Sequence, residues 1–192
     1  MVVLDQYMPI AVGNSYLIAD VHWGTTRNSA QGQSWNQHLY DKAKVTSVVV
    51  YASKAGTPTG TLKCRIASHT GTYGTSSKPL ADLEESSNSK DIAAISSNDA
   101  KPSTLIFYFD GLTEIMKDVP YTFYVYCVSG VMDGSNYVKI WGYVSHDGNR
   151  FYNTLTEGIW ASSSDDVKFT VNGDEIPPVG IASKRLLVGV GL

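Results

Sequence analysis

The chain has 192 residues, a formal net charge of −3 and a charged fraction of only 17%. Average domains carry roughly 25% charged residues, and here Ser, Thr, Asn and 17 glycines take the place of the missing charge. This composition excludes a coiled coil, a basic nucleic-acid binder and a protein with membrane-spanning helices, because each needs a charge pattern or an apolar run absent here.

The N-terminal residues 1–29 precede the regular part of the sequence and contain the apolar stretch Tyr16–Val21 and Trp23. They have neither the basic region nor the long apolar region of a signal peptide, so we expect synthesis in the cytoplasm. We expect this segment to form an arm or an edge strand.

Period-two alternation of apolar and polar residues predicts most of the regular elements. Lys44–Ser53 and Thr61–Ser68 alternate in this way on either side of the Gly- and Pro-containing turn at residues 54–60. We interpret them as the two strands of a hairpin. Five later runs also predict strands: Thr104–Asp110, Tyr121–Ser129, Asn136–Val144, Phe151–Leu155 and Asp166–Val171.

The segment 69–103 is polar and reads as loop. A helix of two turns at Asp91–Ile95, capped by Asp91, is the one element we expect within it. At least seven short strands without a long amphipathic helix predict an all-β fold, an antiparallel β-sandwich of jelly-roll type with N- and C-terminal arms.

The predicted domain is residues 30–176, and residues 177–192 follow it as an arm or an extra strand. The tail VGIASKRLLVGVGL is apolar, and Leu186, Leu187 and Val188 are its candidate contact residues. The tail can complete the sheet of its own chain or pair with the sheet edge of a neighbouring subunit.

Residues for catalysis or metal binding are sparse. The four histidines are scattered, and no nucleophile, phosphate-loop or dinucleotide motif occurs, which predicts a protein that is not an enzyme and needs no cofactor. Asp165 and Asp166 are weak candidates for calcium ligands, the alternative being two solvated residues that open the last strand. Cys64 and Cys127 are interpreted as buried reduced thiols, although their spacing leaves a disulfide open.

Aromatic side chains are the best candidates for contact with partners. Trp23, Trp141 and Trp160 could stack on glycans or anchor a protein interface, and so could Tyr124 and Tyr126 on one face of their predicted strand. The alternative for each tryptophan is packing in the core.

Three stretches of sequence carry a resemblance to a known family: KAGTPTGTLKCRI (54–66), VPYTFYVYCVSG (119–130) and DDVKFTVNG (165–173). In this order they resemble the β-sandwich module called a choice-of-anchor domain, in the versions found in phage tail-associated and bacterial surface proteins. The similarity covers about residues 30–173. It departs from the family pattern in lacking an anchor segment.

The resemblance implies a module for display, adhesion or assembly without a catalytic set. We therefore expect a structural component of a phage or other virus particle, such as a decoration, tail or fibre-associated protein. It would bind itself as a homo-oligomer and other virion proteins. The alternative is a carbohydrate-binding or adhesion module at a cell surface or outside the cell, in which tryptophan and tyrosine contact glycans.

Overall fold

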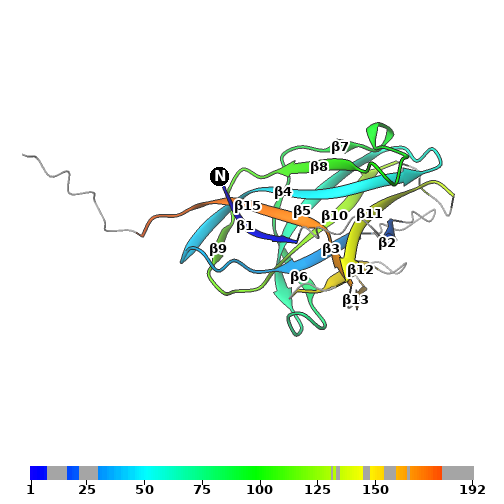
Figure 1. The fold of residues 1–192 in the computed structure, drawn as a ribbon. Coiled ribbons are helices and arrows are strands. Elements are labelled where there is room, and N and C mark those ends of the chain that lie inside the picture. The colour runs from blue at the N-terminus through cyan, green and yellow to red at the C-terminus, as the bar shows by residue number, and fades with distance from the viewer. Residues whose placement is uncertain are drawn as a thin grey trace, which may run out of the picture.

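The computed structural model describes residues 1–7, 17–21, 30–130, 132, 135–144, 148–153, 159–163 and 165–178. Over these residues the chain forms antiparallel strands, as the alternation predicts, and one 3-10 turn (Figure 1). Among the described elements no helix has the length and apolar character needed to cross a membrane.

The strands form two antiparallel sheets, which confirms the all-β sandwich. One sheet has eight strands: β1 (Val2–Tyr7), β2 (Leu17–Val21), β4 (Lys42–Ala55), β8 (Ser103–Tyr108), β9 (Glu114–Met116), β11 (Tyr137–Val144), β14 (Asp165–Val167) and β15 (Phe169–Glu175). The other has seven: β3 (Ala30–Trp35), β5 (Thr61–Thr70), β6 (Lys78–Glu85), β7 (Lys90–Asp91), β10 (Tyr121–Ser129), β12 (Arg150–Asn153) and β13 (Trp160–Ser163). The jelly-roll type and the boundaries of the arms stay predictions.

The long strand β4 organises the eight-stranded sheet. One of its edges pairs with β15 and then β11, and the other with β9 and then β8. β1 pairs with the far side of β15, so residues 2–7 form an edge of the sheet. In the seven-stranded sheet the order is β13-β12-β3-β10-β5-β6, with β7 also on β5.

The main hydrophobic core lies between the two sheets. In β10 the inward side chains are those of Phe123, Val125 and Cys127, as the alternation predicts. Phe123 meets Phe169 of the opposite sheet, with ring centroids 5.2 Å apart. Cys64 also lies in this core, and both thiols are buried and free, which confirms the prediction of reduced core cysteines.

The predicted hairpin around residues 54–60 is wrong. β4 and β5 belong to different sheets, and the turn carries the chain across the sandwich. The reason is that Ala52 near the end of β4 is already paired on both edges, with Ile140 and with Ser103, so β5 pairs with β10. The crossing brings Gly60 against Ser129 with φ +116°, where any side chain would clash.

The expectation of a loop at residues 69–103 is also partly wrong, because the segment contains β6 and β7. β6 shows no alternation, since Leu80 and Leu83 are both exposed. The expected helix is a single 3-10 turn, Ile92–Ala94. Its cap is predicted correctly: a carboxylate oxygen of Asp91 accepts the backbone N–H of Ala93 at 2.9 Å.

A curled aromatic and charged face as candidate functional site

The outer face of the seven-stranded sheet carries a second, smaller hydrophobic cluster. We call it the outer-face cluster; its members are Ala30, Ala67, Tyr124 and Phe151, with Tyr126 and Trp160 packed against them. Strands β6 and β13, at the two edges of the sheet, approach each other to within 8 Å between Cα atoms. Both lie along the lower side of the sandwich in Figure 1. The sheet is therefore curled around this cluster.

The rings of the outer-face cluster meet at steep angles. Trp160 from β13 lies 5.1 Å from Tyr124 at 58° and 5.3 Å from Phe151 at 79°, while Tyr124 and Tyr126 are 5.9 Å apart at 55°. Gly32 makes room for this packing, because a Cβ at that position would come within 2.5 Å of the Phe151 ring. The result is an interlocked group of rings and not a flat row.

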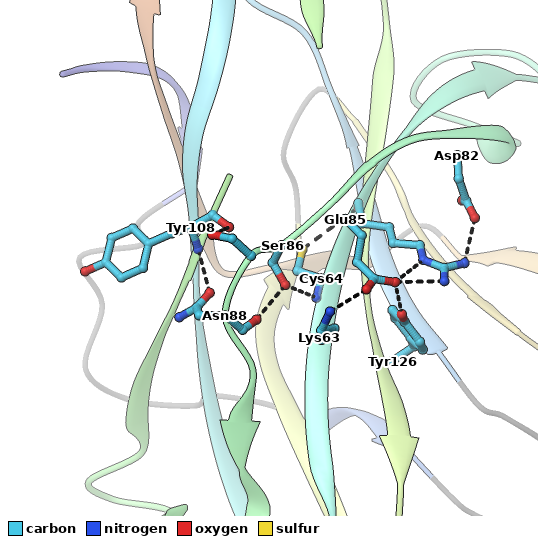
Figure 2. A network of polar contacts seen from close by, with 10 residues as sticks. Lys63, Cys64, Asp82, Glu85, Ser86, Asn88, Tyr108 and Tyr126 are labelled. Carbon is cyan, nitrogen blue, oxygen red and sulfur yellow. Dashed lines mark hydrogen bonds and ion pairs between the residues drawn. The ribbon is translucent and has the colours of Figure 1, made fainter. Parts of the chain in front are cut away.

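A group of four charged residues borders the outer-face cluster, and we call it the charged rim: Lys63, Arg65, Asp82 and Glu85. Arg65 donates to Asp82 at 2.7 Å and to Glu85 at 2.8 and 2.9 Å, and Lys63 donates to Glu85 at 2.5 Å (Figure 2). Lys63 and Arg65 come from β5 and the two acids from β6, so the ion pairs also hold these strands together.

The tyrosine hydroxyls connect the outer-face cluster to the charged rim. Tyr124 donates its hydroxyl hydrogen to Asp82 at 2.5 Å, and Tyr126 donates to Glu85. The guanidinium of Arg65 lies over the Tyr126 ring, 4.6 Å from its centroid, which is a cation–π contact. The two tyrosine hydroxyls and the charged groups of the rim are thus hydrogen-bonded to one another within the protein, without a ligand.

These contacts shift the ionisation of the rim. Partial burial alone would raise the pKa of Glu85, but the hydrogen bonds from Lys63, Tyr126 and Arg65 outweigh it and lower the pKa to about 2. Burial, together with the neighbouring Glu85 carboxylate, raises the pKa of Tyr126 to about 12. Burial and Asp82 likewise raise the pKa of Tyr124. Near neutral pH, Glu85 is therefore an anion and both phenols keep their protons.

An open hollow of about 280 Å³ lies beside the charged rim, lined by Arg65, Asp82, Leu83, Glu84 and Glu85. Leu83 is 43% exposed at this place. The hollow thus offers an apolar side chain next to fixed charges. Arg65, which lines the hollow, also lies over the Tyr126 ring of the outer-face cluster, and arginine and tyrosine are among the residue types that dominate binding energy at protein interfaces.

Residues 86–88 continue the same network towards the opposite sheet (Figure 2). The Ser86 hydroxyl accepts the N–H of Cys64 at 3.1 Å and donates to the carbonyl of Asn88 at 2.9 Å. The Asn88 side chain accepts the N–H of Tyr108 at 2.8 Å and donates to the carbonyl of Ile106 at 3.0 Å. This segment therefore binds the free edge of β8 and closes that side of the sandwich.

The structure brings together three of the predicted contact residues, Tyr124, Tyr126 and Trp160. Tyr124 is 7% exposed, whereas the other two are partly exposed. Trp141 lies elsewhere, on the eight-stranded sheet; it is 8% exposed and donates its indole N–H to Ser53 at 3.0 Å. The remaining contact candidates lie outside the described residues: Trp23, Leu186, Leu187 and Val188.

The candidate calcium ligands do not face solvent together. Asp166 is fully buried and accepts a hydrogen bond from the Gln33 side chain at 2.6 Å, while the side chain of Asp165 lies outside the description. Across the part of the chain that is described, no three His, Cys, Asp or Glu residues are grouped to hold a metal ion. A calcium site here stays a prediction.

The charged rim is a feature that the sequence did not predict. The outward direction of Lys63 and Arg65 was readable from the alternation of β5, where Leu62, Cys64 and Ile66 point inward. Asp82 and Glu85 gave no signal, because β6 was read as loop. The rim arises only where these two strands pair.

Comparison of this chain with protein-family models, curated proteins and solved structures gave no match. The geometry of the outer-face cluster and the charged rim is therefore the structural observation from which a function can be argued.

Proposed function

We propose that this protein is a non-enzymatic structural component of a phage or other virus particle. It is a β-sandwich of jelly-roll type that binds copies of itself and other virion proteins. The observation that carries the proposal is an open hollow lined by Arg65 and the exposed Leu83, which adjoins the outer-face cluster through the contact of Arg65 with the Tyr126 ring. Such groups of residues act as anchors in protein interfaces.

The fixed internal contacts of the rim favour protein assembly. Because Lys63 and Arg65 balance the charges of the two rim carboxylates, a partner does not have to desolvate an isolated charge. The aromatic rings are held by packing, so little side-chain entropy is lost when a partner docks. A pre-organised surface of this kind suits permanent contacts in a particle.

Catalysis by the two rim carboxylates has little support. Glycoside hydrolysis needs one carboxylic acid that is protonated near neutral pH. Asp82 and Glu85 share one guanidinium, and the pKa of Glu85 is about 2. At neutral pH Glu85 has no proton to donate.

A second candidate is a carbohydrate-binding module at a cell surface, and it is favoured by the open hollow, which is lined by charged side chains able to bind sugar hydroxyls. Sugars stack on exposed and roughly coplanar rings. The angles of 55° to 79° between neighbouring rings here give no such platform. We therefore place this function second.

The virion context rests on the sequence. The three stretches of sequence named above resemble β-sandwich modules of phage tail-associated and bacterial surface proteins, and this resemblance supports a place in a particle. The low charged fraction of 17% also suits a surface covered by neighbours.

Two leucines of β6 provide a matched test. Leu83 lines the hollow and Leu80 does not; both are exposed, by 43% and 69%, so arginine at either position leaves the core intact. We expect Leu83→Arg to weaken self-association measured by mass photometry at least tenfold, and Leu80→Arg to leave it near that of the unchanged protein. A chain that stays monomeric at every concentration, or glycan-array binding abolished by Leu83→Arg, would overturn the proposal.

A further inference from the structure

The described edges of the two sheets differ in how well they can accept another strand. An open edge pairs readily because its N–H and C=O groups lack partners. The edge of β8 is occupied by Asn88 and Ser87, which bond to its backbone at Ile106 and Tyr108. β9 has three residues, and the N–H of Met116 already binds the Tyr121 hydroxyl at 3.0 Å.

β1 is a longer and more accessible edge. It has six residues and, among the described strands, pairs with β15 alone. Val2 and Val3 are 41% and 38% exposed. In the other sheet the edge strands β6 and β13 face each other across the outer-face cluster. β2 is a further edge strand and pairs with β11. β11 pairs with the C-terminal end of β4, whereas β9 pairs with its N-terminal end, so β2 lies far from β9.

The chain leaves the sandwich beside the start of β1. Val2 pairs with Gly173, and β15 ends two residues later at Glu175. Pro177 and Pro178 follow and are exposed. Consecutive prolines keep a chain extended, and Figure 1 shows this end pointing away from the sandwich, beyond β15. To reach the edge of its own β1, the chain would have to reverse direction directly after these prolines, whereas reaching the edge of a second copy needs no such reversal.

The composition and reach of residues 179–192 suit an added strand. The segment is apolar, has β-branched residues and no proline, and spans up to about 46 Å when extended at about 3.3 Å per residue. Its two charges, Lys184 and Arg185, are positive. Beside the start of β1, Asp174 and Glu175 are exposed; Asp174 pairs with the N-terminal ammonium of Met1 at 2.8 Å, and Glu175 adds a second negative charge. The charges are therefore complementary.

We propose that residues 179–192 of one copy pair with the open edge of β1 in a second copy. The backbone supplies the hydrogen bonds, while Leu186, Leu187 and Val188 cover Val2 and Val3 of the partner copy. The proposal rests on the assembly function above and names the segment and the edge that perform it.

Cysteine cross-linking between differently sized copies tests this pairing. One full-length chain carries Val3→Cys and a second, enlarged by a tag, carries Ala182→Cys, Leu187→Cys or Val190→Cys in turn, so that different registers are covered. Cys64 and Cys127 are buried and do not interfere. After mixing and mild oxidation, we expect a mixed dimer on a non-reducing gel for at least one tail position.

The matched control replaces Val3→Cys by Val128→Cys, an exposed valine of β10, and should give little mixed dimer. If mass photometry shows oligomers but no tail position cross-links above this control, the pairing is refuted and the assembly function stands. If Val3→Cys and Leu187→Cys in one chain cross-link within a monomer, the tail belongs to its own sheet and the inference is overturned. A monomer throughout refutes both.

Discussion

Glu85 is the residue on which most contacts of the charged rim converge, since Lys63, Arg65 and Tyr126 all donate to its carboxylate. Replacement by glutamine removes the charge but keeps the shape. Because the side chain is a third exposed, we expect Glu85→Gln to lower the free energy of unfolding at pH 7 by only about 1–2 kcal/mol. Urea denaturation measures this loss.

The pH dependence of that loss has a defined direction. The folded pKa of Glu85, about 2, lies below its ordinary value of 4.5, so its stabilisation is complete above pH 4.5 and is lost as the pH falls towards 2. The difference between wild type and Glu85→Gln should therefore shrink in that window. Glu114, an exposed residue paired with Lys42, is the control, and Glu114→Gln should change stability by less than about 0.5 kcal/mol. If the difference in unfolding free energy between wild type and Glu85→Gln stays constant down to pH 2, the lowered pKa of Glu85 is contradicted.

Cys64 and Cys127 should be unreactive in the folded protein. Burial raises the pKa of both thiols, which leaves little thiolate at mild pH. We expect a thiol-specific reagent at pH 8 to label neither cysteine in the native state and both after denaturation. Rapid native labelling of either thiol would show that the core opens far more readily than the packing around it indicates.

At the scale of single elements, the segment 86–88 protects the edge of β8. Asn88 makes the two hydrogen bonds to Tyr108 and Ile106 that a neighbouring strand would make. Asn88→Ala leaves these backbone groups without partners, so we expect a loss of about 1–3 kcal/mol in the free energy of unfolding and increased aggregation on light scattering.

A second asparagine gives the control for that experiment. The side chain of Asn98 accepts one hydrogen bond, from the N–H of Ala100, in an exposed turn. Asn98→Ala should cost less and should not promote aggregation. Equal effects of the two substitutions would show that Asn88 is no more than a turn residue.

The faces of the strands were predictable, but their partners were not. Alternation in β10 separates Phe123 and Val125 from Tyr124 and Tyr126, because successive side chains of a strand point to opposite faces. Partner choice depends on which edges are already occupied, which the sequence of one strand does not contain. The turn at residues 54–60 therefore looked like a hairpin although it crosses between the sheets.

The candidate site was predictable to a similar extent. Tyr124 and Tyr126 come from β10, where the alternation is clear, whereas Trp160 was a candidate only as a tryptophan before a predicted strand and lies in β13, which has no alternation. Its acidic half comes from β6, where four consecutive residues, 80–83, are exposed and no apolar period appears. A strand of this kind is stabilised by its pairing with β5 and by Glu84, whose carboxylate accepts the N–H groups of Gly111 and Thr113.

At the scale of the whole molecule, the main core and the outer-face cluster share one sheet. β10 gives Phe123 to the core and Tyr124 to the cluster, so neither can form without that strand. We therefore expect one cooperative unfolding transition.

Urea denaturation tests this expectation. The transition followed by tryptophan fluorescence should have the same midpoint as the transition followed by far-ultraviolet circular dichroism. Trp160→Phe removes the fluorescent side chain of the outer-face cluster. In this variant both midpoints should move to a slightly lower urea concentration and should still coincide. An earlier fluorescence transition that disappears in Trp160→Phe would show instead that the outer-face cluster opens independently of the sandwich.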